Sequence, residues 1–287
     1  MRSRFELPPR AGAADAPAAR PLEGLLDLPE APGPAPVVVL CHGFKGFAEW
    51  NFLPAVSDLL RERGCATVRF NFRGSGQWLD DDRVTDLETF RRHTLTGDLA
   101  DLHQVLAALP ELAPERLDVE RVALFGHSRG GGMAILAAAD ERWRDRLRAL
   151  ATWAAVSTFD RLGEADLARW RETGSHVIVN ARTGQELPMG LEHLEDFEAH
   201  RVELDVLAAA GRRRAPWLLV HGDRDETVPV SEGEALAAAA APPVELLRIA
   251  GADHTMNSKH PFTGPNPALI QALDATQSWL LRHLRAR

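Results

Sequence analysis

The stretch that decides the fold is Arg121-Val122-Ala123-Leu124-Phe125-Gly126-His127-Ser128-Arg129-Gly130-Gly131. Residues 121–125 form a short apolar run typical of a buried strand, and the small residues from 129 to about 139 predict a helix. Between them lies the pattern Gly-X-Ser-X-Gly, a sharp strand-to-helix turn that exposes the serine oxygen and leaves room only for glycine beside it. This placement predicts that Ser128 is a nucleophile, and the alternative is a fortuitous glycine-rich turn.

Strand and helix patterns alternate on both sides of this turn. Short apolar runs predict further strands at residues 37–41, 65–70, 147–156, 216–220 and 244–249. Helical patterns are found at residues 54–63, 95–109, 231–241 and 269–284, the third opened by a capping box at Ser231-Glu232-Gly233-Glu234. The alternation predicts an α/β fold, a mostly parallel sheet with helices on both faces and a ligand site beyond the carboxyl ends of the strands.

Two kinds of segment interrupt this alternation. The Ala/Pro-rich residues 11–20 and 29–36 predict loops, because proline lacks the amide donor that helices and sheets use. Residues 160–210 are polar and helix-rich, and they are inserted between two predicted strands. We interpret them as a small cap or lid within a single domain of residues 1–287, since α/β folds of this length often form one domain.

Composition and charge argue against several classes of function. Of the 287 residues, 45% are hydrophobic and 26% charged, and the formal net charge of −8 without a basic face argues against nucleic acid or an anionic membrane as partner. Cys41 and Cys65 lie at the edges of apolar runs and are expected to be small buried side chains, not a disulfide or metal ligands. The N-terminus has no signal-like apolar region and no stretch could span a bilayer, so we expect a cytoplasmic protein.

A serine nucleophile needs a base that takes its proton, and the base needs an acid that orients it. Among eleven histidines, His254 follows a predicted strand directly and completes the order Ser…Asp…His, with His260 as the fallback. The acid is expected on the loop after the preceding strand, where Asp225 is central and Asp223 and Glu226 are its neighbours. We therefore predict His254 as base and Asp225 as orienting acid.

The oxyanion of an acyl-transfer reaction needs two backbone donors. The residue after the nucleophile, Arg129, supplies one through its N–H. The loop after the strand at residues 37–41 supplies the other, for which Phe44 is the first candidate and Lys45 the second.

These motifs together resemble a known family. They are His42-Gly43-Phe44-Lys45-Gly46-Phe47, Phe70-Asn71-Phe72-Arg73-Gly74-Ser75-Gly76, Gly126-His127-Ser128-Arg129-Gly130-Gly131 and His221-Gly222-Asp223-Arg224-Asp225-Glu226-Thr227-Val228-Pro229. From about residue 21 to the C-terminal helix the chain resembles α/β-hydrolases, and within them it is similar to the bacterial dienelactone hydrolase-like or cinnamoyl (feruloyl) esterase-like branch. The resemblance implies an eight-stranded, mostly parallel sheet, the triad Ser128, Asp225 and His254, and oxyanion donors at Phe44 and Arg129. The elbow carries serine where dienelactone hydrolases proper carry cysteine.

The expected function is that of a serine hydrolase that cleaves small-molecule carboxylic esters through an acyl-enzyme, without a cofactor or metal. Trp50, Trp78 and Trp170 are candidates for an acyl pocket, with ordinary packing as the alternative for each, and they suggest short to medium or aromatic acyl groups. Two other classes stay open: a serine peptidase or amidase of the same fold, and a non-catalytic binding protein. The sequence does not indicate the oligomeric state.

Overall fold

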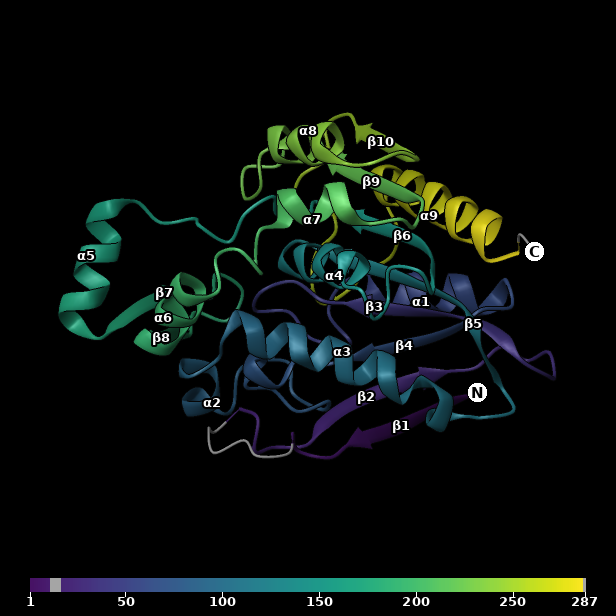
Figure 1. The fold of residues 1–287 in the computed structure, drawn as a ribbon, viewed down its shortest axis with the longest axis horizontal. Helices are drawn as coiled ribbons and strands as arrows, with labels where there is room; N and C mark the ends of the chain where they lie inside the picture. Colours follow the sequence, from purple (N-terminus) through teal and green to yellow (C-terminus); the bar gives the residue numbers. More distant parts are fainter. Residues whose placement is uncertain (11–16, 286–287) are drawn as a thin grey trace.

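Eight strands form one mixed, mostly parallel sheet in the computed structural model, which describes residues 1–10 and 17–285 (Figure 1). The strands are β1(Arg2–Leu7), β2(Leu22–Asp27), β3(Ala35–Cys41), β4(Ala66–Phe70), β5(Leu117–His127), β6(Leu147–Trp153), β9(Trp217–Gly222) and β10(Val244–Ile249). Their order across the sheet is β1-β2-β4-β3-β5-β6-β9-β10. Only β1 with β2 and β2 with β4 pair antiparallel, so the predicted α/β fold is confirmed.

The central strands are apolar on both sides because helices cover both faces of the sheet. In β3, Val37 and Val39 belong to the core on one face, Val38 and Leu40 belong to the core on the other, and all four are fully or almost fully buried. The first face is covered by α3(Leu95–Leu112), α4(Arg129–Ala139), α7(Val206–Arg212) and α8(Val230–Ala239). The second is covered by α1(Leu53–Glu62) and α9(Pro267–Arg285) (Figure 1).

Between β6 and β9 the chain leaves the sheet and builds a separate layer at one end of it (Figure 1). This layer contains α5(Glu164–Thr173), the antiparallel hairpin β7(Ser175–Val179) with β8(Glu186–Gly190), and α6(Leu191–Ala199). Its small apolar core includes Trp170, Leu187 and Met189 and is shared with Val84 and Phe90 of the main body. Hydrogen bonds from Thr96 N to Asp196 Oδ2 (3.0 Å) and from Gln185 Nε2 to the Val84 carbonyl (2.8 Å) fasten it to the main body. Helix α7, which begins within residues 160–210 and ends at Arg212, packs on α4 as part of the helical layer.

Several details of the sequence interpretation are corrected. Strands β1 and β2, the short helix α2(Leu87–Arg91) and the β7–β8 hairpin were not predicted. The loop predicted at 29–36 ends early because β3 begins at Ala35, with Pro36 tolerated beside a register irregularity. Strand β6 ends at Trp153, since Ala154 has a positive φ of 46°. Of the loop predicted at 11–20, residues 11–16 lie outside the described residues.

The predicted capping box of α8 does not form. The helix begins at Val230 with Pro229 as its N-cap, and no side chain caps its first turn. The Glu232 carboxylate instead accepts hydrogen bonds from the backbone N–H (2.8 Å) and hydroxyl (3.0 Å) of Ser157. A tertiary contact thus outcompetes the local one.

Both cysteines are fully or almost fully buried, as predicted. Cys41 and Cys65 are free thiols with at most 1% of their surface exposed. Burial raises the pKa of the Cys65 thiol to about 11, so it stays protonated near neutral pH. Among the described residues, no helix has both the length and the apolar character needed to cross a bilayer.

Candidate active site

The turn between β5 and α4 holds Ser128 in a strained backbone conformation. Its φ of 56° and ψ of −122° are uncommon for any residue with a side chain, and its N–H is anchored to the Trp153 carbonyl on β6 at 2.9 Å. A Cβ on Gly126 would lie 2.4 Å from the Gly130 carbonyl oxygen, and one on Gly130 would lie 2.3 Å from that of His42. Glycine is therefore required on both sides of the serine, as the sequence pattern predicts.

The loops after β9 and β10 bring Asp225 and His254 into contact. His254 Nδ1 lies 2.8 Å from Asp225 Oδ2, and Asp225 Oδ1 accepts the backbone N–H groups of Thr227 (2.9 Å) and Val228 (2.8 Å). The Asp225 side chain is fully buried. Burial alone would raise its pKa, but hydrogen bonds from His221 and His254 and the charge on His254 together hold the pKa below its usual range. An ionised Asp225 fixes the Nδ1–H tautomer of His254 and leaves Nε2 as the free base.

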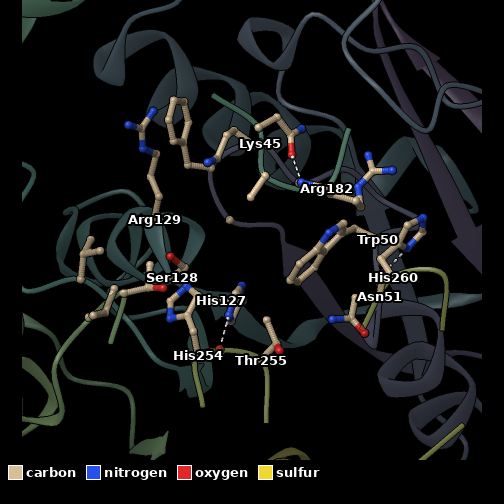
Figure 2. Close-up of a pocket in the computed structure, with 18 of the residues that line it drawn as sticks. Lys45, Trp50, Asn51, His127, Ser128, Arg129, Arg182, His254, Thr255 and His260 are labelled. Carbon is tan, nitrogen blue, oxygen red and sulfur yellow. Dashed lines mark hydrogen bonds between the residues drawn. The ribbon is translucent and has the colours of Figure 1, made fainter. Parts of the chain in front are cut away.

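Figure 2 shows the His254 imidazole beside Ser128 at one edge of a cavity that both residues line. This convergence follows from topology, because β5, β9 and β10 are parallel and end at the same edge of the sheet. The fallback base, His260, lies across the cavity from Ser128 (Figure 2). Its Nδ1 accepts the Asn51 N–H at 3.0 Å, so it supports a loop there.

The loop after β3 runs against the elbow. A Cβ built on Gly43 would lie 3.1 Å from the Ser128 Cβ, so the backbone entering Phe44 passes close to the candidate nucleophile. His42 fixes this loop: its Nε2 accepts the Phe72 N–H at 3.1 Å and its Nδ1 donates to the Gly43 carbonyl at 2.8 Å. Burial lowers the pKa of His42 to about 4, which keeps the ring neutral. Within the described residues no protein acceptor contacts the Phe44 N–H.

Arg129 and Phe44, the two candidate oxyanion residues, also contact each other through their side chains. Arg129 begins α4, so its N–H has no carbonyl one turn earlier to bond with. Its guanidinium carbon lies 3.7 Å from the centre of the Phe44 ring, and its Nη1 lies 3.0 Å from His93 Nε2. Burial, and then the Arg129 charge, lower the pKa of His93 to about 3, so this imidazole is a neutral acceptor. The stacked pair holds together the two loops that carry the donors.

His127, the variable residue of the elbow, has a role that the sequence did not reveal. Its Nε2 donates to the His254 carbonyl at 3.0 Å, and its ring stacks on Trp50 with centroids 5.4 Å apart. Burial, followed by repulsion from His254, lowers the pKa of His127 to about 3. A neutral His127 therefore ties the elbow to the loop of His254. Its place inside the motif was the only signal in the sequence.

The cavity beside Ser128 has a volume of about 710 Å³. The tip of the β7–β8 hairpin, Asn180-Ala181-Arg182, forms part of its wall, so the inserted layer covers the site. The β-branched run at 177–179 followed by Asn180 and Thr183-Gly184 is a hairpin signal that could have indicated this wall. Lys45 and Arg182 also line the cavity and were not predicted as binding residues.

The three tryptophans occupy different places. Trp50 lines the cavity beside Ser128. Trp170 is buried within the inserted layer, where it lines a second, apolar cavity of about 170 Å³ that shares Phe44 and Arg129 with the first. Trp78 lies against the Arg20 guanidinium, is 38% exposed, and lies outside the lining of both cavities in the described part of the chain.

Comparisons with known proteins agree with this architecture. A family profile described as "Alpha/beta hydrolase family" matches residues 38–264. The chain is 26% identical over 213 residues to 2,6-dihydropseudooxynicotine hydrolase of Paenarthrobacter nicotinovorans, covering 74% of this chain but only 50% of that protein. It is 25% identical over 282 residues to an uncharacterized 31.7 kDa protein from the traX-finO intergenic region of Escherichia coli, covering 87% of this chain and 91% of that one.

Solved structures share the fold at low identity. Est1E from Butyrivibrio proteoclasticus with bound ferulic acid superposes with a TM-score of 0.69 at 23% identity, over 93% of this chain and 97% of that one. A dienelactone hydrolase from Anabaena variabilis superposes with a TM-score of 0.63 at 19% identity, over 99% of each chain. At such identities the likeness shows the fold and not the substrate. With the profile matching most of its length, the chain belongs to the α/β-hydrolase family.

Proposed function

We propose that the protein is a serine hydrolase that cleaves carboxylic esters through an acyl-enzyme. The observation that carries the proposal is the 2.8 Å contact between His254 Nδ1 and Asp225 Oδ2, with the imidazole beside Ser128 (Figure 2). A base oriented by a buried carboxylate, next to a strained serine that lines a cavity, is the arrangement that activates a hydroxyl for acyl transfer. Esterase structures that share the fold give independent support.

In the first half of the proposed reaction, His254 Nε2 takes the Ser128 proton as the serine oxygen attacks the ester carbonyl. The backbone N–H groups of Phe44 and Arg129 stabilise the oxyanion that forms. When the tetrahedral intermediate collapses, the bond between the carbonyl carbon and the alcohol oxygen breaks, and the protonated imidazole gives its proton to the alcohol.

In the second half, water replaces the alcohol. His254 takes a proton from the water as its oxygen attacks the acyl-enzyme, and it returns that proton to Ser128 when the carboxylic acid leaves. Asp225 stays ionised throughout and stabilises the imidazolium that forms in each half. None of these steps calls for a metal or an organic cofactor.

The proposal is tested first on Ser128 itself. We expect Ser128→Ala to lower kcat for p-nitrophenyl butyrate by at least about 10⁴-fold, because the nucleophile is lost, and to abolish labelling by a fluorophosphonate probe. The matched control is Ser231→Ala, an exposed serine on α8, which keeps both activity and labelling. Turnover by a folded Ser128→Ala protein at the rate of the parent would refute the assignment.

Ester cleavage is separated from the amidase alternative by a matched pair of substrates. p-Nitrophenyl butyrate and butyryl p-nitroanilide share the acyl group and differ in the scissile bond. We expect kcat/KM to favour the ester by more than the ratio of their uncatalysed hydrolysis rates. A preference for the anilide beyond that ratio would assign the site to an amidase or peptidase, and no labelling of Ser128 with no turnover of either would indicate a binding protein.

A further inference from the structure

Lysine is almost absent from this protein, and its two lysines occur in one place. The 287-residue chain has 33 basic residues, of which only Lys45 and Lys259 are lysines and the rest are arginines. Both lysines line the cavity beside Ser128, although only 22 residues line it. Everywhere else in the chain arginine supplies the positive charge, so this pair distinguishes the cavity from the rest of the molecule.

The charge of the cavity lining is also opposite to that of the whole protein. The chain carries 41 acidic against 33 basic residues, yet no aspartate or glutamate is among the residues that line the cavity. The basic residues that line it are Lys45, Arg129, Arg161, Arg182 and Lys259. In a net-negative protein, a cleft lined by positive charge focuses a field that attracts anions.

Most of these cations lack an acidic partner. Arg161 is compensated, because its Nη1 lies 3.0 Å from Glu232 Oε1. For Lys45, Arg182 and Lys259, and for the guanidinium of Arg129, no carboxylate oxygen of the described residues lies within the 4.0 Å of an ion pair. Arg182 donates instead to the backbone carbonyl of Asp82. The Arg129 guanidinium is already engaged by His93 and Phe44, so Lys45, Lys259 and Arg182 are the cations left to pair with an anion that enters the cavity.

Lys45 lies next to the candidate oxyanion hole, so an anion bound to it would belong to the reacting substrate. It directly follows Phe44, whose N–H is the candidate oxyanion donor, and it has a left-handed backbone with φ of 62°. Burial and then repulsion from Arg129 lower the pKa of its ammonium. The charged form is therefore less stable here than in water, and a nearby anion would stabilise it. Lys45, Ser128 and Arg182 line the same cavity (Figure 2).

We propose that this cavity recognises esters that carry a carboxylate group, with Lys45 as its principal partner and Lys259 and Arg182 as further cations of the same subsite. The inference rests on the proposed function, because it names the substrate class of that site. A carboxylate accepts charge-assisted hydrogen bonds from an ammonium or a guanidinium, and a neutral substrate of the same shape does not. The cationic lining thus gives the cavity a preference that its apolar walls alone would not have.

The test uses two substrates of the same shape, 4-nitrophenyl 4-carboxybenzoate and 4-nitrophenyl 4-carbamoylbenzoate. The rigid ring prevents the carboxylate from attacking its own ester, and the amide replaces the charge with a neutral group. We measure kcat/KM for both and compare the carboxylate-to-carboxamide ratio between proteins, so that intrinsic reactivity cancels. In Lys45→Met this ratio is expected to fall about ten- to hundredfold, the loss of a hydrogen bond to a charged group, and in Lys45→Arg it is largely retained.

The matched control is Arg282→Gln, which removes one positive charge from the outer surface of α9, where the side chain is 63% exposed. Its ratio stays that of the parent. Raising ionic strength lowers the ratio of the parent protein, because salt screens the attraction. Lys259→Met and Arg182→Gln are expected to lower the ratio as well, and they keep the test open if Lys45→Met does not fold.

A binding measurement separates this inference from the catalytic one. Terephthalate and terephthalamide are titrated calorimetrically into Ser128→Ala, which needs no turnover. Tighter binding of terephthalate that weakens in Ser128→Ala/Lys45→Met supports the carboxylate subsite even if the esterase proposal fails. If Ser128 reacts with a fluorophosphonate and both esters are cleaved, but all three cavity variants keep the ratio of the parent, the carboxylate subsite is refuted and the esterase proposal stands.

Discussion

His127 illustrates how one side chain of the site can position another. The hydrogen bond from His127 Nε2 to the His254 carbonyl joins the elbow to the loop of the base, and the ring is neutral because burial lowers its pKa to about 3. The ring therefore stays neutral, and keeps this hydrogen bond, at any pH well above 3. Its effect is on the placement of His254, and so on the rate of proton transfer.

We expect His127→Phe to lower kcat for p-nitrophenyl butyrate by about tenfold with little change in KM, since phenylalanine keeps the stacking on Trp50 and loses one neutral hydrogen bond. His127→Gln, whose amide can donate to the same carbonyl, is expected to recover part of the loss. The control is His283→Phe on α9, which keeps the activity of the parent. An unchanged kcat in His127→Phe would show that this hydrogen bond has no effect on the base.

At the site, the sequence predicts the residues that follow strands and misses those that arrive by tertiary packing. The placement of Ser128, Asp225 and His254 at one edge of the sheet was predictable because each follows a strand that the apolar pattern marks, and parallel strands end together. The side-chain stack of Arg129 on Phe44 was not, because it joins residues from two distant parts of the chain. The approach of Arg182 was not, because it depends on how the inserted layer folds back onto the site. No local sequence pattern determines how the inserted layer packs against the main body.

The same division holds for the secondary structure. Continuous apolar runs predicted β3, β4, β5, β6, β9 and β10. Strand β1 was missed because it is mostly exposed at the edge of the sheet, where its side chains need not be apolar. Strand β2 is mostly buried, but Glu23, Gly24 and Asp27 interrupt its apolar pattern. In α8 the local capping pattern was present but Glu232 bonds to Ser157 instead, so tertiary context overrode it.

Helices α3 and α4 are coupled by a buried acid. Asp98 on α3 faces the Arg129 guanidinium on α4, and burial raises its pKa to about 7 despite the attraction of that cation. An unfolded aspartate titrates at 3.8. Between these values the folded protein holds a proton that the unfolded chain has released, so this group makes the free energy of unfolding fall as the pH rises from about 4 to 7.

We expect Asp98→Asn to remove this dependence. Urea denaturation of the parent and of the variant at pH 5, 6, 7 and 8 gives the free energy of unfolding of each. The parent minus variant difference is expected to decline with rising pH by up to about 1.4 kcal/mol per pH unit and to level off above pH 7, because one titrating group sets the limit. A difference that is the same at all four values would show that Asp98 is ionised in the folded state throughout.

In the molecule as a whole, a buried ion pair between Arg73 Nη1 and Asp101 Oδ1 (2.5 Å) holds the N-terminal segment against the central body. Arg73, just after β4, donates its backbone N–H to Asp101 Oδ2 on α3 (2.8 Å), and its guanidinium donates to the carbonyls of Arg20 (2.7 Å) and Pro8 (2.8 Å). Arg10 Nη1 also reaches Asp101 Oδ1 at 3.1 Å. Arg73 and Asp101 are almost fully buried, so neither can be rehydrated if its partner is lost.

We therefore expect Asp101→Ala to lower the free energy of unfolding by about 3–5 kcal/mol, the effect of leaving a buried charge without its partner. Tryptophan fluorescence during urea denaturation measures it, since the chain has seven tryptophans. The matched control is Asp145→Ala, which breaks the exposed pair with Arg214 and costs less than about 1 kcal/mol. Equal losses of unfolding free energy in the two variants would mean that the buried pair contributes no more than the exposed one. The N-terminal segment would then be held by the packing of β1 and β2.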